Sequence, residues 1–210
     1  MTKERKRALE AVLRMEQAYP DAFCSLMYND PLHLLIATRL AAQCTDARVN
    51  MVTPALFQRF PNITAFANAT PADVEPYIQS CGLYKTKAKD IVALCQKIEK
   101  EFGGEVPNTM EGLISLPGIG RKTANLVLGD IYGQPAVVVD THFTRLCNRL
   151  GFVNTKDPKK IEFIMRDLLP ADKSNDFCHR AVVHGRAVCT ARKAMCQICC
   201  LQDICPKKGF

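Results

Sequence analysis

Apolar residues recur with a helical period along most of this chain, and that periodicity limits its fold more than any other feature. In residues 85–102 they lie about 3.6 positions apart, and two glycines then end the segment. Asp30 followed by Pro31, like the Asp-Pro pair at 157–158, is typical of a helix start. No segment alternates apolar and polar residues for long, and residues 135–139 are expected to be a buried connector. The pattern predicts an all-α fold.

Residues that favour helix caps suggest where further helices begin. Asp46 is expected to cap one helix, and Ser174 another. Asn108, with Glu111 three residues later, resembles a capping box. In the helix that begins at Pro158 we expect the apolar residues to face the core, namely Ile161, Ile164, Met165, Leu168 and Leu169.

The overall composition excludes several classes of protein. The 210 residues are enough for one large or two small domains, and a hydrophobic content of 48% is ordinary for a globular chain. No apolar run approaches the ~18 residues of a membrane span, and residues 1–14 do not resemble a secretion signal. We therefore expect a cytoplasmic protein with no membrane partner. Basic residues exceed acidic ones by 28 − 21 = 7, which weakly favours a polyanionic partner.

Residues 113–128 have the sequence of two helices joined by a tight turn. Pro117 cannot continue the first helix, and Gly118 and Gly120 permit a turn with positive φ. The second helix is expected to begin near Arg121, where its first amides can donate to the oxygens of a phosphate. Such contacts position a nucleic acid without reading its sequence. The alternative is an ordinary helical hairpin that uses proline and glycine.

Cysteines are concentrated near the end of the chain. Four of them have the spacing C-x6-C-x2-C-x5-C, and these are Cys189, Cys196, Cys199 and Cys205. Without a secretion signal a disulfide framework is not expected, so clustered thiolates indicate a metal. Their chemistry alone leaves zinc and an iron–sulfur cluster both open. Cys200 is surplus and is left out of the ligand set.

Several motifs occur together in one order along the chain. They are Ala41–Asp46 (AAQCTD), Gly82–Tyr84 (GLY), Gly104–Pro107 (GEVP), the hairpin, Val139–His142 (VDTH) and the cysteine cluster. In this order and spacing the chain resembles the endonuclease III branch of the helix–hairpin–helix DNA glycosylases over nearly its whole length. The resemblance implies two lobes with an active-site cleft between them. One is a six-helix barrel of residues 23–133, and the other is a discontinuous iron–sulfur domain of residues 1–22 and 134–210.

The resemblance also implies a cofactor, a [4Fe–4S] cluster held by the four spaced cysteines. We expect the cluster to be structural, because the lyase chemistry of the family does not need it. The loop between the first two ligands contains Arg192 and Lys193. In the family this loop contacts DNA phosphates. A solvated basic loop is the alternative for these two residues.

By the same resemblance Lys122 is the nucleophile that attacks the sugar, and this chemistry needs an unprotonated amine. The dipole of the second helix and the neighbouring Arg121 both disfavour a cation at Lys122, and burial in a cleft would add to this effect. The alternative is an ordinary solvated lysine in the first turn of a helix. Asp140 is expected to stabilise positive charge on the sugar, and it is also a good helix N-cap. A carboxylate touching the lysine would favour its charged form. We therefore expect Asp140 near the reacting sugar and not in a tight ion pair.

The resemblance assigns DNA contacts as well. Gln43 and Leu83 would fill the space left by a flipped nucleotide, although Leu83 could instead be a core residue. The remaining expected contacts are Gly118, Gly120, Arg121 and His142, together with the two basic loop residues. The expected partner is double-stranded DNA with damaged bases or abasic sites, bound by a monomer at the nucleoid.

The function implied is that of a bifunctional DNA glycosylase and abasic-site (AP) lyase of base excision repair. It would remove oxidised or ring-saturated pyrimidines through a Schiff base on Lys122 and then nick the strand. One alternative is a monofunctional, adenine-removing relative, a branch that usually lacks this lysine. Another is a non-enzymatic DNA-binding or redox-sensing module. The sequence leaves open the preferred lesion, the opposite base, the balance of the two rates and any redox role of the cluster.

Overall fold

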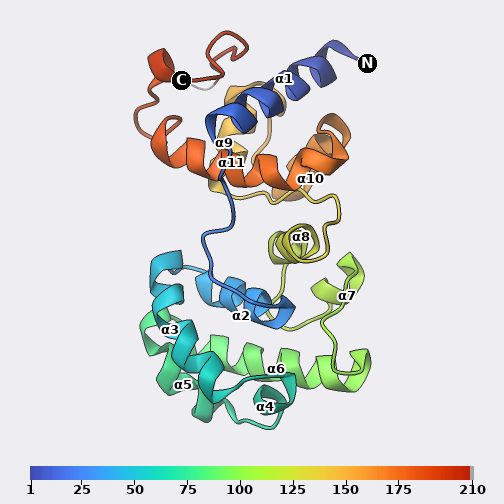
Figure 1. Ribbon diagram of the computed structural model, residues 1–210, viewed down its shortest axis with the longest axis vertical. Coiled ribbons are helices and arrows are strands. Elements are labelled where there is room, and N and C mark those ends of the chain that lie inside the picture. The colour runs from blue at the N-terminus through green and yellow to red at the C-terminus, as the bar shows by residue number, and fades with distance from the viewer. Residues whose placement is uncertain (209–210) are drawn as a thin grey trace. The chain divides into compact units, whose positions relative to one another are not determined.

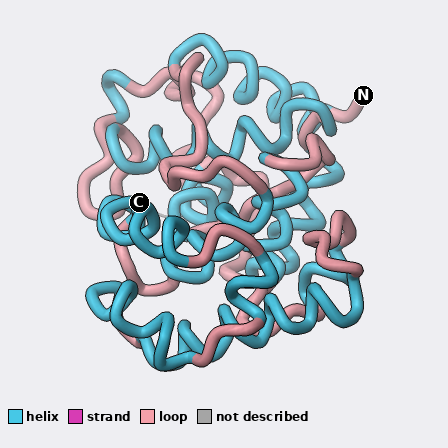
Figure 2. The backbone as a smooth tube through the Cα atoms, turned by 60° about the horizontal axis from the view of Figure 1, so that its bottom comes forward, coloured by secondary structure: helices cyan, strands magenta, loops and turns pink. Residues whose placement is uncertain are grey.

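The computed structural model describes residues 1–208, which form helices joined by turns and loops with no β-strand (Figures 1 and 2). The all-α prediction is confirmed. The chain divides into two compact units. The middle unit contains residues 24–132, and the terminal unit contains residues 1–23 together with the chain from Gly133 onward. None of the helices in residues 1–208 is long and apolar enough to traverse a membrane.

The middle unit is built around helix α2. Its helices are α2 (Pro31–Ala41), α3 (Asp46–Arg59), α4 (Ile63–Ala67), α5 (Pro71–Ile78), a 3-10 turn (Gln79–Cys81), α6 (Tyr84–Phe102), α7 (Met110–Ile114) and α8 (Arg121–Asp130). Helix α2 packs against α3, α6 and α8, and α6 packs against α4 and α5. Leu34, Leu35 and Ile36 of α2 are completely buried, as expected for a central helix.

Side-chain caps determine where the helices of this unit begin. Asp30 accepts a hydrogen bond from the His33 amide at 2.8 Å, which confirms the predicted start of α2. Two predicted caps are displaced by one residue. Thr45, not Asp46, caps α3 by accepting from the Arg48 amide, and Thr109, not Asn108, caps α7. In both cases the hydroxyl of the threonine beside the predicted cap accepts the bond from the helix amide. Thr, Asp and Asn are all favoured at the N-cap, so the sequence does not show which of two neighbours is the cap.

The terminal unit brings together segments that are far apart in the chain. Its helices are α1 (Lys3–Ala18), α9 (Thr141–Arg149), α10 (Pro158–Leu168) and α11 (Ser174–Ala187), with 3-10 turns at Ala171–Lys173 and Cys196–Ile198. Helix α11 packs against α9 and α1, and α1 also packs against α10. The rings of Phe143 and Phe177 meet edge to face at 6.1 Å in the core. The predicted connector at residues 135–139 has no regular structure and buries Ala136, Val137 and Val139.

Two expectations for this unit are wrong. Ile164 of α10 is 40% exposed, because the buried stripe of this helix is narrow and runs through Ile161 and Met165. Ser174 is the first residue of α11 and not its cap. Its hydroxyl donates to the Ala171 carbonyl at 3.0 Å in the preceding turn.

Candidate active site and cysteine centre

The predicted hairpin joins α7 to α8. Helix α7 ends at Ile114, and the Ile119 amide donates to the Leu116 carbonyl at 3.2 Å to close the turn. Gly118 lies in the left-handed region with φ +74°, as expected for a glycine that permits the turn. Gly120 is the N-cap of α8 and offers no side-chain cap to its first amides. Since the positive end of the helix dipole also lies here, this helix start suits an anion.

Gly118 is also required by what packs beside it. Arg39 of α2 donates through Nε to Asp90 Oδ2 of α6 at 2.8 Å, and little of either side chain is exposed. A Cβ at position 118 would lie 2.6 Å from Arg39 Nε and 2.7 Å from Asp90 Oδ2. The hairpin therefore rests directly on an ion pair that joins α2 to α6.

Replacing Gly118 with alanine should destabilise the middle unit. The left-handed backbone costs an L-residue about 1–2 kcal/mol, and overpacking at the ion pair adds roughly 1–3 kcal/mol. Gly120→Ser is the matched control, because a Cβ there meets nothing within 4 Å and its φ of −104° suits serine. Thermal unfolding should show a lower midpoint for Gly118→Ala alone. Equal midpoints for the two variants would contradict this account.

Lys122 is the second residue of α8 and is exposed, while Arg121 before it is half-buried. Ala124 and Val127 are fully buried behind them and fix the helix in the core. Lys122 thus lies in the first turn of the helix, as the sequence predicts. It belongs to the middle unit, whereas Asp140 belongs to the terminal unit.

Gln43 and Leu83 share an unusual backbone conformation. Gln43 follows α2 with φ +55°, and Leu83 precedes α6 with φ +47°. Such conformations cost non-glycine residues of order 1–3 kcal/mol and are concentrated at functional sites. Both residues are exposed, Leu83 by 60%. The alternative that Leu83 is a core residue is therefore wrong.

Asp140 is half-buried and caps α9, because its Oδ1 accepts from the Phe143 amide at 2.7 Å. His142, two residues later, has its Nδ1 3.1 Å from Nη2 of Arg145. A guanidinium can only donate, so this nitrogen accepts and a neutral His142 carries its proton on Nε2. The start of α9 thus presents a carboxylate and an N–H donor.

The four spaced cysteines line one cavity of the terminal unit. Cys189 is buried and the other three are half-buried. Cys200 does not line the cavity. In residues 1–208 no three His, Cys, Asp or Glu side chains converge as ligands of a single metal ion.

Polar groups are directed at these sulfurs. Arg149, which is 8% exposed, donates through Nη1 to Cys189 Sγ at 3.2 Å and to the Thr190 carbonyl at 2.8 Å. The Leu201 amide donates to Cys199 Sγ at 3.4 Å. Donors of this kind stabilise thiolates and the groups that thiolates bind. Burial raises the pKa of Cys205, so a positive charge in the cavity would help to hold it as a thiolate.

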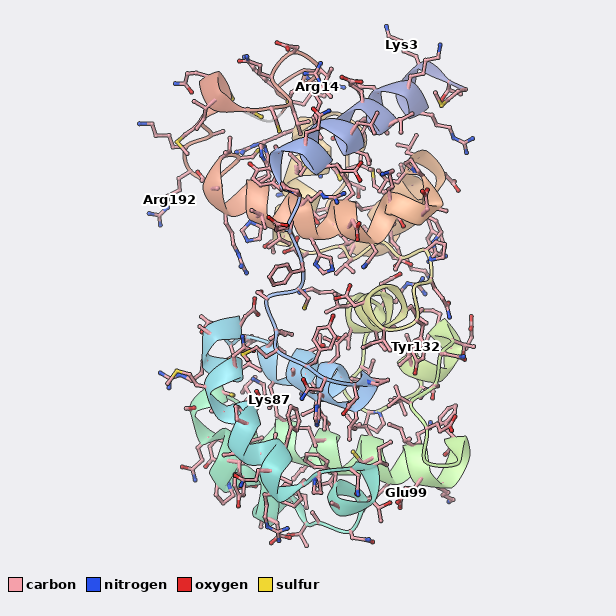
Figure 3. The ribbon with its side chains drawn as sticks, viewed as in Figure 1. Lys3, Arg14, Lys87, Glu99, Tyr132 and Arg192 are labelled. Carbon is pink, nitrogen blue, oxygen red and sulfur yellow. The ribbon has the colours of Figure 1, made fainter. Side chains whose placement is uncertain are left out.

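The loop between the first two cysteines is exposed at both predicted basic residues, Arg192 and Lys193. Thr190 accepts a hydrogen bond from the Lys193 amide at 3.1 Å, and Cys189 pairs with Ala194 in an isolated bridge. The Arg192 side chain points away from the rest of its unit (Figure 3). The loop is thus held at both ends and presents its charges outward.

Sequence reasoning missed four charged residues that organise these regions: Lys87, Arg149, Arg39 and Asp90. Lys87 lies between apolar positions on the buried face of α6. A charged residue in an apolar stripe is the signal that could have revealed it.

Comparison with known proteins identifies the family. The description "HhH-GPD superfamily base excision DNA repair protein" matches residues 36–171. Endonuclease III of Synechocystis sp. is 48% identical over 98% of this chain and 94% of its own length. Endonuclease III of Escherichia coli K12 is 37% identical over 96% of each chain. A solved non-covalent endonuclease III–DNA complex superposes with a TM-score of 0.90 at 36% identity, covering 99% of this chain and 97% of that one. The hairpin, the cysteine centre and these likenesses agree, and the chain belongs to the HhH-GPD superfamily of base excision DNA repair proteins, among the endonuclease III relatives.

Proposed function

We propose that this protein is a bifunctional DNA glycosylase and AP lyase that acts on double-stranded DNA with damaged bases or abasic sites. The observation that carries the proposal is the exposed lysine in the first turn of α8, directly after a hairpin suited to phosphate. A monofunctional glycosylase does not need this amine, and neither does a protein that only binds DNA. We propose that it works as a monomer on DNA inside the cell, with the middle unit as the barrel lobe and the terminal unit as the cluster lobe.

In the proposed reaction a damaged nucleotide leaves the duplex, and the Lys122 amine attacks its C1′. The bond from C1′ to the base breaks, and the base departs with the electron pair and is then protonated. The amine nitrogen then loses a proton and the bond from C1′ to the ring oxygen O4′ breaks, which opens the sugar and leaves a Schiff base at C1′. This Schiff base makes the C2′ proton acidic. Loss of that proton and cleavage of the bond from C3′ to its oxygen nick the strand. Asp140 stabilises the positive charge that develops on the sugar.

The hairpin positions the strand. The first amides of α8, reached across Gly118 and Gly120, hold a phosphate, and Arg121 adds its charge. His142, Arg192 and Lys193 bind further phosphates, and such contacts are independent of sequence. Gln43 and Leu83 fill the space that the flipped nucleotide leaves. Their exposed, left-handed conformations support this role.

For the substrate we propose oxidised or ring-saturated pyrimidines. The covalent route is supported by a second solved relative, which is described as a trapped endonuclease III–DNA covalent intermediate. The adenine-removing alternative is not favoured, because Lys122 is present and the relatives from Synechocystis sp. and Escherichia coli are endonuclease III proteins.

Borohydride trapping on a panel of duplexes tests this proposal. Borohydride reduces a Schiff base to a stable link, so the protein should become attached to duplexes that carry an abasic site or a ring-saturated pyrimidine. It should not become attached to an undamaged duplex or to one with an adenine mispair. Base release without any trapping would favour a monofunctional enzyme, and binding without base release or nicking would favour a non-enzymatic module.

We also propose that the cavity of the terminal unit holds a [4Fe–4S] cluster through Cys189, Cys196, Cys199 and Cys205. Four cysteine ligands suit zinc and a [4Fe–4S] cluster alike, and the resemblance to the endonuclease III family favours the cluster. The donors from Arg149 and Leu201 fit the charge of such a group. When bound, the cluster supplies covalent cross-links that fold the end of the chain.

Cys199→Ser should remove the bound iron and sulfide, because it deletes a ligand that lines the cavity. Cys200→Ser is the matched control and should retain both, since Cys200 lies outside the cavity lining. Iron and sulfide analysis and visible absorption after purification without oxygen provide the measurement. A colourless wild-type protein loaded with zinc would contradict the assignment, as would equal loss in the two variants.

A further inference from the structure

Lys87 of α6 is a completely buried lysine. Its Nζ donates to the Leu40 carbonyl at 2.8 Å and to the Cys81 carbonyl at 2.6 Å. Its side chain lies between α6 and the end of α2 (Figure 3). Burial lowers the pKa of Lys87, so a cation is costly here unless the surrounding oxygens compensate it. Buried lysines are rare, and a purely structural contact between these helices would be simpler to build from apolar side chains.

Both carbonyls belong to segments that end in a strained, exposed residue. Leu40 lies in the last turn of α2, three residues before Gln43, and Cys81 lies two residues before Leu83. The backbone amide of Lys87 also donates to the Leu83 carbonyl at 3.0 Å. One residue therefore bonds to both sides of the Leu83 turn and to the end of the helix that leads into Gln43.

A local bond closes the Gln43 turn, because the Cys44 amide donates to the Ala41 carbonyl at 3.1 Å, but that bond does not reach the Leu83 turn. A Cβ at Gly82 would meet nothing within 4 Å, and Leu83 has no side-chain cap bond at the start of α6. The exposed fraction of Leu83 is 60%, so packing of its side chain in the core does not hold it. Beneath the surface the two turns are connected by the bonds from Lys87 and by the contact between the Cys44 and Cys81 side chains.

We infer that Lys87 is a positioning residue that fixes the two exposed residues Gln43 and Leu83 relative to each other, so that both can enter the duplex when a nucleotide is flipped. This inference rests on the proposed function. Lys87 touches neither DNA nor the reacting atoms. It acts by tying the backbones of two turns to one charged group, and a 1 Å displacement of a positioned group can cost on the order of 100-fold in rate.

The test is Lys87→Met, which nearly keeps the length of the side chain and removes Nζ with both of its hydrogen bonds. Nicking of an abasic site in a duplex should fall roughly 10- to 100-fold. Nicking of the same site in a single-stranded oligonucleotide should be unchanged, because no duplex has to be opened. Affinity for a duplex with a reduced abasic analogue should fall, while affinity for an undamaged duplex should not. Equal losses on the duplex and on the single strand would overturn the inference.

Two controls separate positioning from loss of stability. Leu94→Ala removes a buried side chain from the same helix, so it lowers the unfolding midpoint without touching either turn. It should leave the ratio of duplex to single-strand nicking unchanged. In a Gln43→Ala, Leu83→Ala background, Lys87→Met should cost nothing further on duplex DNA, because the positioned side chains are gone. An additive loss in that background would overturn the inference.

Lys87→Gln provides a second variant if the methionine protein does not fold, since it keeps a donor on a shorter, neutral side chain. Its duplex nicking should also fall while its single-strand nicking is retained, and an unchanged duplex rate would count against Lys87. Failure of the proposed function would give a different result from failure of this inference. In that case the wild-type protein would nick neither substrate and would form no borohydride adduct.

Discussion

Lys122→Gln should abolish both nicking of abasic DNA and borohydride trapping, with a loss of at least about 10³-fold. Glutamine has no amine that can attack C1′, so neither the Schiff base nor the elimination that follows it can form. Lys122 is exposed in the first turn of α8. Exposed substitutions of this kind usually change stability by less than about 0.5 kcal/mol. The loss should therefore appear in protein that unfolds at the wild-type temperature.

Lys159→Gln is the matched control, because Lys159 is also the exposed second residue of a helix, α10. It removes the same charge and should leave trapping intact. Single-turnover nicking and adduct formation on an abasic duplex provide the measurement. Normal adduct formation by Lys122→Gln would show that another amine is the nucleophile, and the enzymatic account given for α8 would be wrong.

Asp140→Asn should reduce base removal by roughly 10²- to 10³-fold, the range found when a group that stabilises transition-state charge is removed. The side chain has two roles that this variant separates. Oδ1 of Asp140 accepts from the Phe143 amide at 2.7 Å, and an asparagine oxygen can accept the same bond. The cap should therefore survive while the negative charge is lost.

Asp140→Ala is the companion variant, which removes the cap as well and should cost a further ~0.5–2 kcal/mol of stability. Base release from a duplex with a ring-saturated pyrimidine, followed together with thermal unfolding, distinguishes the two roles. If Asp140→Asn kept full activity and only Asp140→Ala lost it, the carboxylate would be a helix cap with no part in the reaction.

The elements with local signals could be predicted from the sequence. Proline and glycine mark the hairpin, and the helical period marks α6. Where proline directly follows the cap, as at Asp30 and Asp157, the predicted start of the helix was correct, because proline is favoured at the first helical position. At Thr45 and Thr109 two acceptors stand side by side, and the choice between them depends on geometry that a sequence does not carry.

The features that could not be predicted depend on contacts between distant segments. The buried amine of Lys87 on α6 donates to the Leu40 carbonyl, 47 residues earlier in the chain. The clash that excludes a side chain at Gly118 comes from Arg39, almost 80 residues earlier, and from Asp90. The roles of Lys122 and Asp140 came from resemblance, since an exposed lysine and a helix cap are each ordinary by themselves.

The terminal unit is built from two separate stretches of the chain, and this has a consequence for synthesis on the ribosome. Helix α1 is made first, but Ala8, Ala11, Val12 and Met15 are buried in a core completed by residues beyond 133. At about 5–20 residues per second, the nascent α1 waits roughly 10–40 s for these partners. Residues 24–132 can fold meanwhile. Chaperones that shield short amphipathic segments should therefore bind this chain early and release it only near the end of translation.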